Sequence, residues 1–90
     1  MRMTTARFEQ VARKAVSDVA WDKYQMRVEP EALEMVWYCH LLSNKKAILM
    51  VPGFRGVYDR IFEVTYNMLS DELYVDAYVK ESNTRVGGGG

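Results

Sequence analysis

Two stretches in the second half of the chain alternate between apolar and polar residues, and this pattern constrains the fold more than any other feature. They run from Ile61 to Tyr66 and from Leu73 to Lys80, separated by the turn-forming residues from Asn67 to Asp71. A period of two is typical of half-buried strands, and a short polar connection predicts an antiparallel hairpin. We expect one face of this hairpin to carry Phe62, Val64, Tyr66, Leu73, Val75, Ala77 and Val79.

The N-terminal part of the chain predicts a helix from Thr5 to about Lys23, with the Thr5 hydroxyl as its N-cap. Apolar residues recur there at spacings of three and four, which places them on one side: Phe8, Val11, Ala12, Ala15 and Val19. Trp21 falls on the polar side. Either the helix ends before Trp21 and the indole folds back into the core, or Trp21 contacts another molecule.

The segment from Leu33 to Leu42 fits two structures. Pro30 suits the first position of a second helix at about 31–42, which would leave a three-stranded sheet. The run Val36-Trp37-Tyr38-Cys39 instead favours a strand, paired through a polar turn with the apolar run 47–51. We favour the strand. The resulting fold class is α+β, with an N-terminal helix packed on a four-stranded antiparallel sheet made of two hairpins.

Composition limits the classes of function. The 90 residues carry 12 Lys and Arg against 12 Asp and Glu, and this balance argues against general nucleic-acid binding. One cysteine excludes an internal disulfide, and no apolar run is long enough to cross a bilayer. We expect a single domain over residues 1–86, a disordered glycine tail over 87–90, a cytoplasmic location, no membrane contact, and no metal or cofactor.

The first predicted hairpin is apolar on both faces. With Asn44 and Lys45 in the turn, one face carries Trp37, Cys39, Leu41, Ile48 and Met50, and the other carries Tyr38, His40, Leu42, Ala47, Leu49 and Val51. A single helix covers only one face, so we expect a homo-oligomer, at least a dimer. The expected interface residues are Trp21, Tyr38, His40, Leu42 and Leu49.

The chain offers few groups for catalysis. His40 and Cys39 are adjacent, so in a strand they point to opposite faces and cannot act as a base and its nucleophile. Glu63 and Asp76 share the polar face of the second hairpin, where strand-face charges are more common than acid–base pairs. We therefore predict no catalytic residues and no enzymatic activity.

The segment 52–60 combines arginines and aromatic residues between glycines. Such side chains can clamp and stack a planar anion such as a nucleotide, although a solvated connection between strands fits the same residues. The expected ligand-binding residues are Phe54, Arg55, Tyr58 and Arg60, with Tyr74 and Tyr78 from the second hairpin.

Several short motifs resemble a known family: Val36-Trp37-Tyr38-Cys39, Leu42, Asn44, Lys46-Ala47, Glu63-Val64-Thr65-Tyr66-Asn67 and Glu72-Leu73-Tyr74-Val75-Asp76-Ala77-Tyr78. The similarity covers roughly residues 5–83. The family consists of small uncharacterised proteins of tailed bacteriophages and of prophages, mostly in Gram-positive hosts. The resemblance implies a phage origin and a host cytoplasmic setting, and it supplies no catalytic residues.

These observations lead to two hypotheses for the function. In the first, a phage accessory protein without enzymatic activity oligomerises and sequesters a host component, such as a nucleotide-type immune signal, to counter host defence. In the second, the same surfaces bind and inhibit a host enzyme, with no small ligand.

Overall fold

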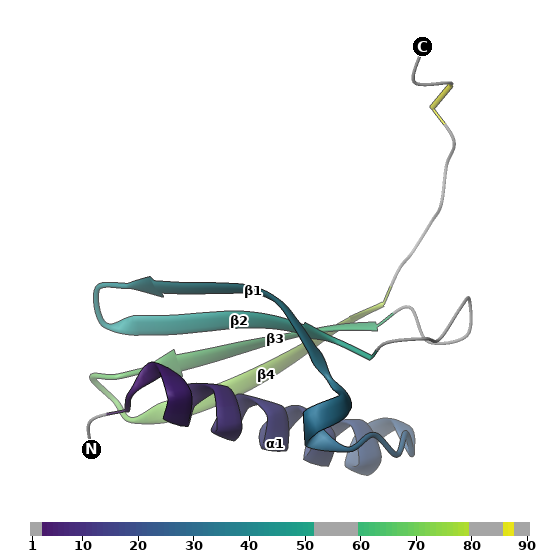
Figure 1. Cartoon of the computed structure of the whole chain (residues 1–90), viewed down its shortest axis with the longest axis horizontal. Coiled ribbons are helices and arrows are strands. Elements are labelled where there is room, and N and C mark those ends of the chain that lie inside the picture. Colours follow the sequence, from purple (N-terminus) through teal and green to yellow (C-terminus); the bar gives the residue numbers. More distant parts are fainter. Residues whose placement is uncertain (1–2, 52–59, 80–85, 88–90) are drawn as a thin grey trace.

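The structure, a computed structural model, describes residues 3–51, 60–79 and 86–87, without the side chains of Arg60 and Val79. The elements in chain order are α1 (Thr5–Tyr24), the 3₁₀ turn η1 (Pro30–Ala32), β1 (Glu34–Leu41), β2 (Asn44–Met50), β3 (Arg60–Asn67) and β4 (Glu72–Val79). The strands form one antiparallel sheet in the order β1-β2-β3-β4, and α1 packs on one side of it (Figure 1). This confirms the α+β prediction.

The alternative with a second helix at about 31–42 is wrong, because only Pro30–Ala32 is helical there and the strand β1 follows. The predicted disorder of the glycine tail concerns residues 88–90, which lie outside the described residues, and Gly87, whose φ is 94°.

Helix α1 begins one residue earlier than the sequence suggests. Its N-cap is Thr4, whose hydroxyl accepts a hydrogen bond from the backbone N–H of Arg7 at 3.1 Å, so the prediction of Thr5 as the cap is wrong. The helix continues to Tyr24, where Gln25 takes the left-handed conformation with φ of 57°. Trp21 therefore lies within the helix, and the interpretation in which the helix ends before it is also wrong.

The core lies between α1 and the sheet. The side of α1 that faces the sheet carries Phe8, Ala12, Val16 and Ala20, all fully buried. They share the core with alternate residues of the strands beneath them, namely Ala47, Leu49, Phe62, Val64 and Tyr66. Leu73, Val75 and Ala77 of β4 pack against this core, as the alternation predicts. Helix α1 packs mainly on β2, β3 and β4.

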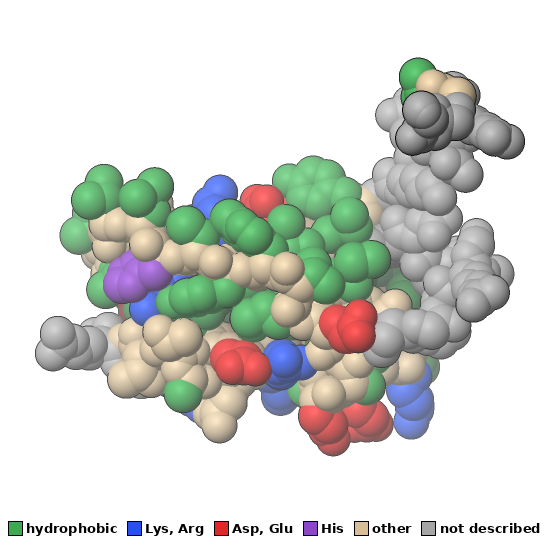
Figure 2. All heavy atoms as spheres, turned by 45° about the horizontal axis from the view of Figure 1, so that its top comes forward, with side chains coloured by type: hydrophobic (Ala, Val, Ile, Leu, Met, Phe, Trp, Pro, Cys, Tyr) green, Lys and Arg blue, Asp and Glu red, His purple; other side chains and the backbone are tan. Residues whose placement is uncertain are grey.

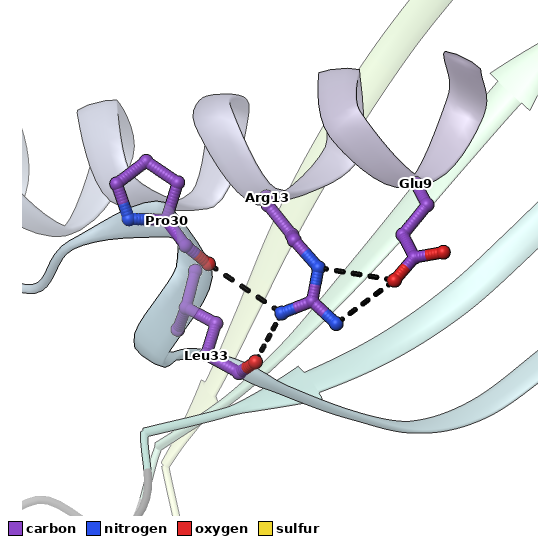
Figure 3. Close-up of polar contacts among 4 residues, drawn as sticks. All are labelled: Glu9, Arg13, Pro30 and Leu33. Carbon is purple, nitrogen blue, oxygen red and sulfur yellow. Dashed lines mark hydrogen bonds and ion pairs between the residues drawn. The ribbon is translucent and has the colours of Figure 1, made fainter. Parts of the chain in front are cut away.

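Arg13 holds the start of β1 against α1 (Figure 3). Its guanidinium donates hydrogen bonds to the backbone carbonyl of Leu33 and, at 3.4 Å, to that of Pro30, while Glu9 holds its other side at 3.0 Å. A planar guanidinium can reach these acceptors at once. The connection after α1 is therefore fixed where β1 begins.

The turn between β1 and β2 differs from the predicted one. Leu41 pairs with Asn44, so the turn consists of Leu42 and Ser43 rather than Asn44 and Lys45. Leu42 has φ of 55°, a conformation that favours glycine or asparagine, and local residue preference therefore does not predict it. Instead the turn is held by its neighbour, because the backbone N–H of Met68 donates to the Ser43 carbonyl at 2.8 Å.

Two leucine-to-alanine substitutions test this packing. Leu49→Ala removes a fully buried side chain and should lower the free energy of unfolding by about 2–5 kcal/mol. Leu69→Ala is the matched control, because Leu69 is 85% exposed in the β3–β4 turn and its loss should change stability by less than about 0.5 kcal/mol. Urea unfolding of both variants measures the difference, and equal effects would contradict the assignment of the covered face.

Candidate functional site

The most distinctive surface is the sheet face opposite α1, which we call the open face. Alternate residues of the strands form it: Trp37, Cys39, Leu41, Asn44, Lys46, Ile48, Met50, Ile61, Glu63, Thr65, Asn67, Glu72, Tyr74, Asp76 and Tyr78. Among the elements that the structure describes, α1 packs on the other face and none packs on this one. A second, partly apolar sheet surface is thus left to solvent.

The apolar part of the open face lies at the end where β1 begins. In register, Trp37 lies opposite Ile48, and Met50, Ile61 and Tyr78 are neighbours across three strands. Trp37 is 45% exposed and Tyr78 is 53% exposed. Figure 2 shows hydrophobic side chains gathered along the β1 side of the molecule. Large exposed apolar groups that adjoin in this way mark a binding surface more often than a solvated one.

The middle of the open face is polar. Glu63 and Asp76 are direct cross-strand partners, and the Lys46 ammonium lies 3.8 Å from the Glu63 carboxylate. The two carboxylates thus share a face as the sequence predicts, and one of them is paired with a cation. Within residues 3–51, 60–79 and 86–87, no three His, Cys, Asp or Glu side chains gather in a way that would hold a metal ion.

Two of the six predicted ligand residues can be placed on this surface. Tyr74 and Tyr78 project from the open face of β4 and are about half exposed. They are four positions apart in β4, so their rings lie about 13 Å apart along the strand and do not form one clamp. The Arg60 backbone pairs with Val79. Its side chain, together with the predicted ligand residues Phe54, Arg55 and Tyr58, lies outside the described residues.

The predicted oligomer interface needs a correction, because α1 covers the face that the sequence analysis assigned to a second copy. Leu49 is fully buried in the core, so its assignment to the interface is wrong. Tyr38 lies on the same covered face, with its ring 5.8 Å from that of Phe8. His40 is on that side as well, exposed at the margin of the sheet. Both faces are apolar, and alternation alone does not indicate which one the helix takes.

The other two predicted interface residues are exposed but lie apart from each other. Leu42 is 89% exposed in the β1–β2 turn. Trp21 is 49% exposed on α1, where the Arg27 guanidinium lies 5.1 Å from its ring centroid. Trp21 and Arg27 line a surface pocket of about 240 Å³ between α1 and the segment that follows it. The Arg27 guanidinium thus gives the exposed indole of Trp21 a favourable cation–π contact within its own chain.

Sequence reasoning missed the environment of Lys45. This residue is 3% exposed, and its ammonium lies 3.4 Å from the Tyr38 hydroxyl and 3.5 Å from His40 Nδ1. The shifted turn places Lys45 opposite His40 on the covered side of the sheet. A correct prediction of the β1–β2 register would have indicated that Lys45 is buried, since Lys45, Ala47 and Leu49 lie on the same face of β2.

The match to a family model covers residues 8–87 and carries the description of a family of unknown function, DUF6275. The chain belongs to the DUF6275 family. All four strands and most of α1 lie within the DUF6275 match, so the open face is part of the family domain. No curated protein and no solved structure matches the chain.

Substitution of Tyr74 tests the polar contacts on β4. The Tyr74 hydroxyl donates to the Glu72 carboxylate at 2.8 Å, and hydrogen bonds from Tyr74 and then Ser70 lower the pKa of Glu72 below 4.5. A lowered pKa contributes stability above the unfolded value, and this contribution is lost as the pH falls through the folded pKa. Tyr74→Phe should therefore raise the pKa of Glu72 and reduce stability at neutral pH.

Carboxyl NMR titration and urea unfolding at two pH values measure both effects. In acid, where Glu72 is protonated, wild type and Tyr74→Phe should be equally stable as far as this contact is concerned. Tyr78→Phe is the control, because no bond of Tyr78 to Glu72 is present and the Glu72 titration should not move. An unchanged Glu72 pKa in Tyr74→Phe would exclude the contact.

Proposed function

We propose that this chain is a binding protein without enzymatic activity, which assembles with itself and sequesters a host component. In this proposal it is a phage-encoded accessory protein in the cytoplasm of the host, and the component is a nucleotide-type immune signal. The observation that carries the proposal is the open face, where Trp37, Ile48, Met50, Ile61 and Tyr78 adjoin. The resemblance to phage proteins supports the biological setting.

The exposed fractions of these side chains indicate how much free energy their burial by a partner would contribute to binding. Trp37, Met50, Ile61 and Tyr78 are between 38% and 53% exposed. Full burial of such side chains is worth about 1.5–3 kcal/mol each, so covering the exposed part contributes roughly 1 kcal/mol per residue. Association itself costs about 4–15 kcal/mol, so these four side chains of one copy do not suffice. In an assembled protein, the same side chains of a second copy add their own contacts. This favours a binding surface formed by both copies.

Assembly is tested by the mass in solution. We expect light scattering at micromolar concentration to report at least twice the chain mass of 10.4 kDa, and dilution to lower it. A constant mass of 10.4 kDa over the whole range of concentrations would remove self-assembly from the proposal.

Calorimetry with a panel of cyclic and ADP-ribose-type nucleotides tests the ligand. A base stacked on Tyr78 would gain about 1–3 kcal/mol, so Tyr78→Ala should weaken binding by a factor of about 5 to 150. Tyr78→Phe keeps the ring and is the matched control. If no nucleotide gives heat while the assembly remains intact, the small-ligand part of the proposal fails.

The second candidate function is inhibition of a host enzyme through the same surface. It is favoured by the form of the site, because Tyr74 and Tyr78 lie apart on an exposed sheet face together with Ile61. Affinity capture from a host lysate should then return one protein in stoichiometric amount, and Ile61→Asp should abolish the capture. Only this version requires a protein partner, so a positive nucleotide titration with no captured protein would exclude it.

A further inference from the structure

Within residues 3–51, 60–79 and 86–87, no strand pairs with the outer edge of β1, and this free edge is the part of the surface whose partner the structure indicates most clearly. The strand order places β1 and β4 at the two edges of the sheet (Figure 1). Val36, Trp37, Leu41 and Leu42, all in β1 or its turn, are 45–89% exposed. Proteins usually protect an edge strand with charges, proline or a bulge, because its unpaired backbone groups attract another strand. Here β1 has a bulge only near its start, between Met35 and Trp37.

Charge distinguishes the two edges. Residues 35–42 contain no Asp, Glu, Lys or Arg, whereas β4 carries Glu72 and Asp76 on the open face. Antiparallel pairing of a strand with its own copy brings like residues close together across a two-fold axis. Pairing through β4 would therefore place four carboxylates on two neighbouring strands, and like charges across strands are destabilising. Pairing through β1 brings no like charges together, which favours a second copy of this chain as the partner there.

The backbone of β1 also restricts the register. The bulge and the turn at Leu42 leave one regular stretch, Trp37 to Leu41, whose midpoint is Cys39. The pair that closes a two-residue turn, here Leu41 and Asn44, exchanges hydrogen bonds, and such pairs alternate along a hairpin. The N–H and C=O groups of Tyr38 and His40 consequently point away from β2, toward the free edge.

We propose that β1 pairs antiparallel with β1 of a second copy, across a two-fold axis at Cys39, to form a continuous eight-stranded sheet. This inference rests on the self-assembly in the proposed function and specifies its geometry. Tyr38 exchanges backbone hydrogen bonds with His40 of the second copy, and His40 does the same with Tyr38. On the open face, Trp37 lies opposite Leu41 of the second copy, so two exposed apolar residues of each chain become neighbours.

This arrangement has a consequence for the binding surface. Opposite residues in an antiparallel pair share a face, so both α1 helices lie on one side and both open faces on the other. The two copies of Trp37 and Leu41 occupy the middle of the joined open face. Ile61, Tyr74 and Tyr78 remain uncovered toward each end, available to the host component.

The position of Cys39 allows a direct test. In the proposed register the two Cys39 residues form a pair without backbone hydrogen bonds, whose Cα atoms lie about 4.5 Å apart. This distance is within the range that a disulfide spans. Diamide should therefore cross-link the native wild-type protein at least a hundredfold faster than the same concentration of chain unfolded in urea. The cysteine serves here as a reporter of the register.

Two variants with the cysteine moved are the matched controls. Cys39→Ser/Leu41→Cys keeps the thiol on the same strand and face, but its copies would lie about four residues apart along the pair, or roughly 13 Å. Cys39→Ser/Tyr74→Cys places the thiol on the other edge strand. Both should cross-link no faster than the unfolded chain. Circular dichroism and light scattering show whether each variant keeps its fold and its assembly.

The outcomes separate this inference from the proposed function. Fast cross-linking of Cys39 alone, with an intact assembly, supports the β1 pairing. An assembled protein in which Cys39 cross-links slowly, or in which either moved cysteine cross-links as fast, overturns the pairing and leaves self-assembly standing. A monomer at every concentration overturns both.

Discussion

The packing of one helix on one face of the sheet is the interaction on which the rest of the structure depends. Helix α1 buries Phe8, Ala12, Val16 and Ala20 against alternate residues of the strands. Small alanines on α1 and at Ala47 let the helix approach the sheet closely, and the aromatic rings of Phe8 and Phe62 fill the space between them. Because α1 is the one long helix among the residues that the structure describes, no described helix covers the opposite face.

The uncovered face has two different parts, and their chemistry divides the tasks that we propose for it. The β1 part is mostly apolar, and residues 35–42 at its outer edge, which no other described strand pairs with, carry no Asp, Glu, Lys or Arg. The β3–β4 part combines Ile61 and two tyrosines with the paired charges of Lys46 and Glu63. The first suits another copy of the same chain, and the second suits a component with both apolar and polar groups. Arg13 matters to the first part, because it holds the start of β1 in place.

The sequence predicts much of this architecture, because the spacing of apolar residues in its periodic segments indicates whether each forms a helix or a strand. Alternation along 61–66 and 73–80 predicts the second hairpin and the faces of Phe62 and Val64, and the spacing after Thr5 predicts α1. The β1–β2 turn is different. Its left-handed Leu42 is unfavourable locally, and pairing with β3 together with the bond from Met68 to Ser43 determines its position. Such contacts between distant residues have no signature in a single sequence.

The choice of face could not be predicted for a related reason. When Trp37 and Ile48 on one side are as apolar as Ala47 and Leu49 on the other, the pattern shows that two faces need cover but not which one α1 takes. Three of the five predicted interface residues, Tyr38, His40 and Leu49, consequently fell on the covered face. The predicted ligand site stays a prediction. Of its six residues, only Tyr74, Tyr78 and the backbone of Arg60 lie among the described residues.

The central claim is that the β1 edge beside Trp37 pairs with another copy in solution, which brings Leu41 of that copy against Trp37. Acrylamide quenching of Trp37 fluorescence tests it most directly, in a Trp21→Phe variant that leaves Trp37 as the one indole of the chain. The account predicts strong quenching at high dilution and protection of Trp37 as the protein concentration rises into the micromolar range. Quenching that stays equally strong at every concentration would contradict it.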